Sequence, residues 1–264
     1  MQEHATLPVT VPLSTWRGDS FSRSFPSSLS VAIFDATASA KKWRIDGLTI
    51  QELDMLAFST RDLGADSDNN LTSITIRLSA RDKESYPNVP RAWLALFLSR
   101  WYGLESICLE FRSRVLRENG LTTSIRKIQD TFEVSKDPLW PCRPEGPVTW
   151  TKLRKLSLCH FDSTPKALLS LITRHSSTLR DLRLNAIWLD GEGSVLSAEY
   201  SWREIFRSIR ATTSLEKVAL SGVFRNNSHE DDVWDFNNEG LAKVVASWIT
   251  NGAECPLTDN LDSV

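Results

Sequence analysis

The sequence predicts an α/β fold in which a short strand and a helix alternate along the chain. One pattern occurs six times in the 264 residues: an aliphatic residue, two variable residues, an aliphatic, one variable residue and a final aliphatic. Segments with apolar residues at helical spacing lie between several of these copies. Because parallel strands need a crossover connection, this alternation favours a parallel sheet with right-handed crossovers.

Each copy of the pattern marks one expected strand, with its aliphatic side chains directed into a core. The shorter intervals between copies match a leucine-rich repeat, whose period is about 20–29 residues. Such units stack into a solenoid, with the parallel sheet on the concave side and helices on the convex side. The expected strands contain Ile45/Leu48/Ile50, Leu71/Ile74/Ile76, Leu104/Ile107/Leu109, Leu153/Leu156/Leu158, Leu179/Leu182/Leu184 and Leu215/Val218/Leu220.

Besides one helix in the long interval between the third and fourth strands, four helices are expected between or after these strands, because apolar residues recur there at i, i+3 and i+4. Pro165 suits a first helical turn, and Ser163 or Thr164 can cap that helix. Gly252 marks the end of the last helix. The apolar faces are Trp93, Leu96 and Phe97; Leu168, Leu171 and Ile172; Trp202, Ile205, Phe206 and Ile209; and Leu241, Val244, Val245, Trp248 and Ile249.

The repeat pattern divides the chain into three parts. Residues 1–42 are rich in Ser, Thr and Pro and are expected to form a leader or partial cap. Residues 43–257 are expected to form the irregular repeat solenoid, and residues 258–264 a tail. An insertion at about 112–149 combines one expected helix with a proline-rich stretch that excludes regular structure.

Composition places the chain among ordinary soluble proteins. It is 41% hydrophobic and 24% charged, with a formal net charge of −2, so nucleic acid is not an expected partner. No segment has the ~20 apolar residues of a membrane helix, and the start lacks the pattern of a secretory signal. Four scattered cysteines indicate reduced thiols rather than disulfides or a zinc site. We expect a cytoplasmic or nuclear monomer without a cofactor.

No group of residues predicts catalysis. Cys159 and His160 are adjacent, but neighbours on a strand point to opposite faces, so their side chains are expected to diverge. His175 is expected to bond the last carbonyls of a helix. The acidic run at residues 229–232 is interpreted as a flexible surface loop, with a partner-binding loop as the alternative.

The variable positions of the last three strands provide the candidate binding surface. We expect Lys155, Arg183 and Lys217 at about the same height on successive strands, close to Asp181 and Glu216. Such a cationic stripe would receive an acidic or phosphorylated segment of a partner; a solvated, charge-balanced surface is the alternative. Which face binds stays open. The candidate partner-binding residues are Lys155, Ser157, Asp181, Arg183, Asn185, Lys217 and Trp188.

One position of the repeat is unusual. A regular leucine-rich repeat has Asn or Cys three residues after the last strand aliphatic, where its side chain bonds the turn backbone. The positions carry Phe161, Ile187 and Val223 here, so the turns must be satisfied in another way. The solenoid is therefore expected to be irregular.

Several loose motifs occur in the second half of the chain: Trp150 to Leu158, Ser177 to Leu184, the helix Trp202 to Ile209, the pair Ser221-Gly222, and Asn251 to Leu257. With these motifs the chain resembles, over residues 43–257, the C-terminal repeat region of filamentous-fungal F-box proteins. This resemblance implies a substrate-recognition role in a ubiquitin ligase. The helical F-box itself is not seen, because the only Leu-Pro, Leu7-Pro8, is followed by Val-Thr-Val-Pro.

These observations lead to one expected function with two alternatives. We expect a non-enzymatic protein-interaction scaffold. One alternative is a truncated or degenerate repeat protein without binding activity. The other is an α/β enzyme with an unrecognised site, although no Gly-rich phosphate loop or exposed nucleophile turn is visible.

Overall fold

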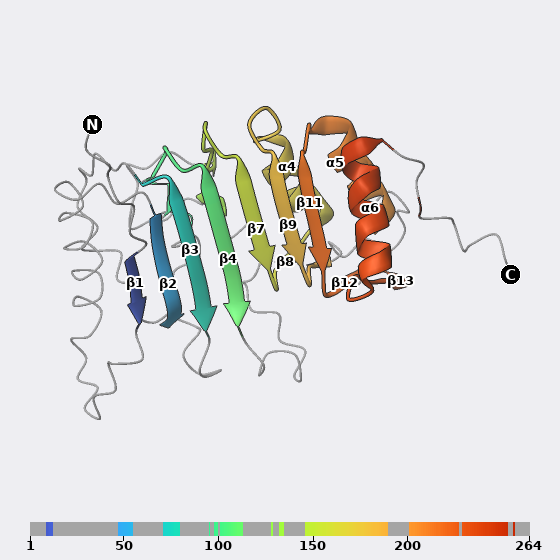
Figure 1. The fold of residues 1–264 in the computed structure, drawn as a ribbon, viewed down its shortest axis with the longest axis horizontal. Coiled ribbons are helices and arrows are strands. Elements are labelled where there is room, and N and C mark those ends of the chain that lie inside the picture. Colours follow the sequence, from blue (N-terminus) through green and yellow to red (C-terminus); the bar gives the residue numbers. More distant parts are fainter. Residues whose placement is uncertain are drawn as a thin grey trace, which may run out of the picture. The chain divides into compact units, whose positions relative to one another are not determined.

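The computed structural model shows a mixed α/β protein with a parallel sheet, which confirms the expected fold class at that level (Figure 1). The chain divides into two compact units, residues 1–125 with 130–153, and residues 126–129 with 154–264. The structure describes residues 9–12, 47–54, 71–79, 95, 98–99, 101–112, 128, 132–134, 146–189, 201–226, 229–252 and 256. The helix expected around Trp93, Leu96 and Phe97 lies outside these residues.

The first unit contains four parallel strands in chain order. They are β1 (Val9–Pro12), β2 (Gly47–Asp54), β3 (Ser73–Ser79) and β4 (Ser106–Arg112). Strands β2, β3 and β4 are the first three strands that the aliphatic pattern predicts. Strand β1 lies within the stretch expected to be a leader or partial cap, and it extends the sheet beyond β2.

The alternation of β3 and β4 follows the pattern. Ile74 and Ile76 on β3, and Ile107 and Leu109 on β4, are completely buried. On the opposite face, Arg77 and Glu110 are register partners and form an ion pair at 2.9 Å. In the insertion, β5 (Glu133–Val134) pairs antiparallel with β6 (Gly146–Pro147), so the proline-rich stretch does not exclude regular structure at Pro147.

The second unit contains the last three predicted strands and a second, smaller sheet. Strands β7 (Lys155–Cys159), β9 (Asp181–Asn185) and β11 (Lys217–Ser221) are parallel. Strands β8 (Asp162–Ser163), β10 (Trp188–Leu189) and β12 (Val223–Asn226) follow them and pair in parallel. Strand β13 (His229–Asp235) pairs antiparallel with β12. The expectation of a flexible loop for the acidic run was therefore wrong.

Three helices of the second unit begin at polar caps. Helix α4 (Pro165–Thr173) is capped by Thr164, whose hydroxyl accepts from the Ala167 N–H at 3.1 Å. Helix α5 (Trp202–Thr212) begins after Ser201. Helix α6 (Glu239–Asn251) begins after Asn238 and ends at Gly252, whose φ of 76° is left-handed. The prediction of Gly252 as the stop is confirmed, because the missing Cβ makes that conformation accessible.

A left-handed residue follows each of the strands β7, β9 and β11. These residues are His160 (φ 61°), Ala186 (φ 49°) and Gly222 (φ 75°). Their turns are joined by backbone hydrogen bonds, from His160 N–H to the Asn185 carbonyl (2.8 Å) and from Ala186 N–H to the Ser221 carbonyl (2.9 Å). These bonds satisfy the turns without the Asn or Cys side chain of a regular repeat.

The core of the second unit combines aliphatic strand residues with an aromatic cluster. Trp202, Phe206, Phe224 and Phe236 are buried, and their neighbouring ring centroids lie 4.8–6.2 Å apart. Stacked, edge-on and tilted contacts of this kind stabilise the packing beyond area burial. Phe161 and Ile187 are also completely buried, so apolar packing takes the place of the polar turn side chain at these positions.

Candidate functional site

The candidate site lies on the outward face of β7, β9 and β11. Leu156, Leu158, Leu182 and Leu184 are buried on the inner face, so the residues between them face outward. The structure thereby places six candidates on one sheet face: Lys155, Ser157, Asp181, Arg183, Asn185 and Lys217.

The strand register corrects the expected cationic stripe. Lys155, Asp181 and Lys217 are aligned across the three strands, so a carboxylate lies between the two lysines. Arg183 lies two residues further along β9, aligned with Ser157 and Ala219. The expectation that the three cations share one height was therefore wrong. The surface is a mixed-charge face, with an acid at its centre.

Arg183 and Asp181 form a two-point contact on β9. The Arg183 Nε donates to Asp181 Oδ1 at 3.1 Å, and the second guanidinium nitrogen donates to Oδ2 at 3.0 Å. The Arg183 side chain is 48% exposed, so the pair contributes less than about 1 kcal/mol to stability. Its main effect is to fix the guanidinium direction. Among the described residues, Lys217 has no carboxylate partner, so its charge is available to a ligand.

A cleft of about 360 Å³ lies between this face and helix α6. Val218 and Ala219 of β11 and Ala246 of α6 form the apolar part of its lining. Charged groups line it as well, and α6 adds two hydroxyls. The complete lining is Asp181, Arg183, Glu216, Lys217, Val218, Ala219, Ala246, Ser247 and Thr250.

The two hydroxyls of the cleft differ in what they offer. Thr250 Oγ1 donates to the Ala246 carbonyl at 3.0 Å, so its proton is used within the helix. Ser247 Oγ accepts from Asn251 Nδ2 at 3.3 Å, which leaves its own proton for a ligand. The cleft therefore combines an ammonium group and a hydroxyl donor with an apolar wall.

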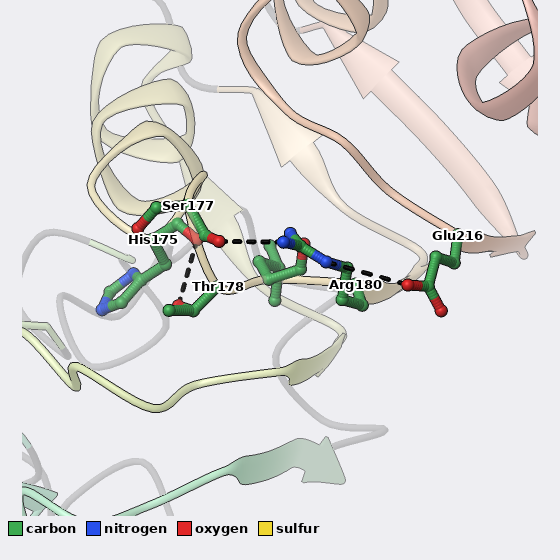
Figure 2. Close-up of polar contacts among 6 residues, drawn as sticks. His175, Ser177, Thr178, Arg180 and Glu216 are labelled. Atoms are coloured by element: carbon green, nitrogen blue, oxygen red, sulfur yellow. Dashed lines mark hydrogen bonds and ion pairs between the residues drawn. The ribbon is translucent and has the colours of Figure 1, made fainter.

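Polar contacts order the turn that leads from α4 into β9 (Figure 2). The Thr178 hydroxyl donates to the His175 carbonyl at 3.3 Å, and the Arg180 guanidinium donates to the Ser177 carbonyl at 3.0 Å. Arg180 Nε also lies 3.8 Å from a carboxylate oxygen of Glu216, at the rim of the cleft. These contacts link the entry of β9 to the entry of β11, and so fix the edge of the site.

His175 has the structural role that the sequence predicts, but as a neutral group. Its side chain is buried, and Nδ1 donates to the Leu171 carbonyl at 2.8 Å. Burial lowers the pKa of His175 from its ordinary value of 6.5; the Leu171 hydrogen bond raises the pKa and Arg174 lowers it further. The imidazole therefore acts as a hydrogen-bond donor rather than as a cation.

A pH-dependent loss of stability follows from this burial. The unfolded chain binds a proton at His175 near pH 6.5, whereas the folded chain binds it only at lower pH. The contribution of His175 is thus complete above pH 6.5 and decreases as the pH falls below it. We expect urea unfolding to show this decrease between pH 7.5 and 5. In a His175→Gln variant, the free energy of unfolding should fall less between pH 7.5 and 5. If the free energies of the two proteins changed with pH in parallel, the proposed effect of His175 would be contradicted.

Trp188 is separated from the other candidates. It lies on β10 of the second sheet, where it is half-buried and aligned with Arg225 of β12. The Arg225 guanidinium carbon lies 5.6 Å from the centre of the Trp188 ring, a cation–π contact. Trp188 therefore does not join the surface formed by the six strand residues.

Cys159 and His160 are closer together than expected. The expectation that their side chains diverge was wrong, since Cys159 Sγ lies 3.3 Å from His160 Nδ1. Strand β7 ends at Cys159, and the left-handed conformation of His160 breaks the alternation of side chains at that point.

The helix side of the cleft was missed in the sequence. Ala246, Ser247 and Thr250 are small residues at i, i+1 and i+4, so they leave space where α6 meets the sheet. The apolar spacing predicts the buried face of this helix, but it gives no signal for the small residues that line the cleft.

The described residues contain no group of three or more His, Cys, Asp or Glu side chains suited to a metal ion. In the same part of the chain, no helix combines the length and the apolar character needed to cross a bilayer. Comparisons of the chain with protein-family models, with curated proteins and with solved structures found no match.

Proposed function

We propose that this protein is a non-enzymatic protein-binding module that uses the outward face of β7, β9 and β11. The single observation that carries the proposal is the cleft between β11 and α6, because it combines an accessible lysine with an apolar wall at the edge of an exposed sheet face. A volume of about 360 Å³ is at the low end for ligand sites, and is suited to one or two side chains.

The proposed occupant is an extended partner segment with an acidic side chain. The aliphatic part of a glutamate would contact Val218, Ala219 and Ala246, and its carboxylate would accept from the Lys217 ammonium and the Ser247 hydroxyl. Bonds to charged groups are about twice as strong as neutral ones. A phosphorylated residue would use the same two donors.

The mixed charge of the face supports selection of partner segments by the spacing of their acidic residues as well as by their net charge. Among the six candidates on this face, three are cations and one is an acid. Asp181, held by Arg183, would repel a second acid at the centre while Lys155 and Lys217 on either side attract one. We therefore propose a segment whose acidic residues are separated rather than continuous.

The wider proposal keeps the expectations drawn from the sequence. The repeated units would form an irregular leucine-rich-repeat solenoid that acts as a monomer in the cytoplasm or nucleus. Its role would be similar to that of the substrate-recognition region of fungal F-box proteins.

A displayed library of random peptides, with and without phosphoserine, tests this proposal. The full chain should enrich peptides with separated acidic residues, and the dissociation constant of the best peptide is then measured by fluorescence polarisation. We expect Lys217→Glu to weaken binding by tenfold or more, on the order of one lost charged contact. Ala219→Trp should also abolish binding by filling the cleft, since Ala219 is exposed and its replacement leaves the core intact.

Lys166→Glu provides the matched control, because this exposed lysine lies on α4, outside the site. It makes the same change in net charge and should leave binding unchanged. If Lys217→Glu and Lys166→Glu weakened peptide binding equally, the interaction would be a non-specific charge attraction. Failure to enrich any peptide family would overturn the binding role and favour a degenerate repeat protein.

A further inference from the structure

We propose that Cys159 and His160 form a reactive thiol site that undergoes exchange with small disulfides. This site is independent of the cleft, since neither residue lines it. Cys159 Sγ lies 3.3 Å from His160 Nδ1, which places a nucleophile and a base in direct contact. Cys159 is a half-buried free cysteine.

The backbone positions the imidazole against the thiol. The His160 N–H donates to the Asn185 carbonyl on the neighbouring strand at 2.8 Å, which fixes the peptide that carries the ring. The left-handed φ of 61° then directs the side chain back toward Cys159 rather than to the other sheet face. The contact is thus a product of the ordered sheet edge.

The two following turns show that histidine is not required for this conformation. The corresponding pairs are Asn185-Ala186 after β9 and Ser221-Gly222 after β11. Neither pair contains a thiol or a base, and both second residues are small. If only a left-handed conformation were needed here, glycine would adopt it at lower conformational energy than histidine. His160 therefore adds a chemical group at some conformational cost.

The proposed reaction is a balanced exchange. An ordinary thiol is only about 3% ionised at pH 7, and a neighbouring imidazole that accepts the proton increases the thiolate fraction. The Cys159 thiolate attacks one sulfur of a disulfide R–S–S–R, the S–S bond breaks, and a new Sγ–S bond forms. The released R–S⁻ takes the proton from the imidazolium, so no other oxidant is needed.

Cys108 provides an internal reference for this reactivity. It is also a half-buried free thiol on a parallel strand, β4, but its chain neighbours are Ile107 and Leu109. A thiol with similar exposure and no adjacent base should react at the ordinary rate.

The test treats the full chain with dithiobis(nitrobenzoate), an aromatic disulfide, at pH 7. Timed samples are quenched in acid and digested with pepsin, which preserves mixed disulfides, and mass spectrometry then follows each cysteine separately. We expect Cys159 to be modified on the order of tenfold faster than Cys108. In a His160→Gly variant, Cys159 should react at the rate of Cys108.

The Ala186→Gly variant is the matched control, because it makes the same left-handed replacement one strand away without removing the imidazole. It should retain the fast reaction of Cys159, and circular dichroism should show that both variants fold. Three outcomes would overturn the proposal: no modification of native Cys159, equal rates for Cys159 and Cys108, or a rate in His160→Gly that equals wild type.

Discussion

Replacement of Asp232 by alanine is expected to lower the free energy of unfolding by about 3 kcal/mol, although the residue lies in a run that looks like a surface loop. Asp232 Oδ2 accepts from the Trp202 N–H and from Asn226 Nδ2, both at 3.0 Å, and Oδ1 accepts from Trp234 Nε1 at 2.7 Å. The carboxylate also lies at the positive end of α5. Its loss would leave the buried Asn226 amide without this acceptor. Urea denaturation measures the change.

Asp235→Ala is the matched control for this experiment. Asp235 is an exposed acid on the same strand, and its side chain bonds only the backbone and amide of Asn237 among the contacts that the structure shows. We expect Asp235→Ala to lower the free energy of unfolding by less than about 1 kcal/mol. Asp232→Asn should fall between the two, because it keeps an acceptor oxygen but loses the charge. Similar costs for Asp232→Ala and Asp235→Ala would mean that Asp232 does not hold the start of α5.

Replacement of Gly222 by alanine is expected to have an effect of similar size, about 2–3 kcal/mol of destabilisation. The φ of 75° costs a residue with a Cβ about 1–2 kcal/mol. In addition, a Cβ at this position would lie 2.7 Å from Asn185 Oδ1 and 3.0 Å from the backbone nitrogen of Ala186. The Ala186 N–H donates to the Ser221 carbonyl, so a shift of this nitrogen would weaken that hydrogen bond.

The same backbone conformation leads to a much smaller expected effect at the preceding turn. Ala186 has a φ of 49°, so glycine relieves strain there, while the loss of a buried methyl group acts against it. We expect Ala186→Gly to remain within about 1 kcal/mol of wild type. A Gly222→Ala protein as stable as wild type would show that the turn can rearrange, and thermal unfolding of both variants decides this.

The strands of the sheets were predictable because their signal is local. Leu156 and Leu158, or Ile74 and Ile76, alternate with polar residues and need no knowledge of distant contacts to be recognised. Helix ends could be predicted equally well. Thr164 caps a helix through its own side chain, and Gly252 ends one through its left-handed conformation. The short strands β8, β10 and β12 carry too few residues for a periodic signal.

The site was only partly predictable, because its geometry depends on register and on turns. The six residues of one face follow from alternation, but the height of Arg183 requires alignment of whole strands, and that alignment places it two residues beyond Lys155 and Lys217. The contact between Cys159 and His160 depends on the positive φ of His160, which the residue types at this turn do not predict. The strand β13 was missed because its polar residues make long-range bonds, such as that of Asp232 to Trp202.

The position of helix α6 has a consequence for self-association. Strand β11 is the last strand of its sheet, and an uncovered edge would offer a row of backbone donors and acceptors to another polypeptide. Helix α6 packs against β11, and Figure 1 shows it alongside that strand. Undocking of this one helix would expose the edge of β11, so we expect release of α6 to promote aggregation of the protein without unfolding of the core.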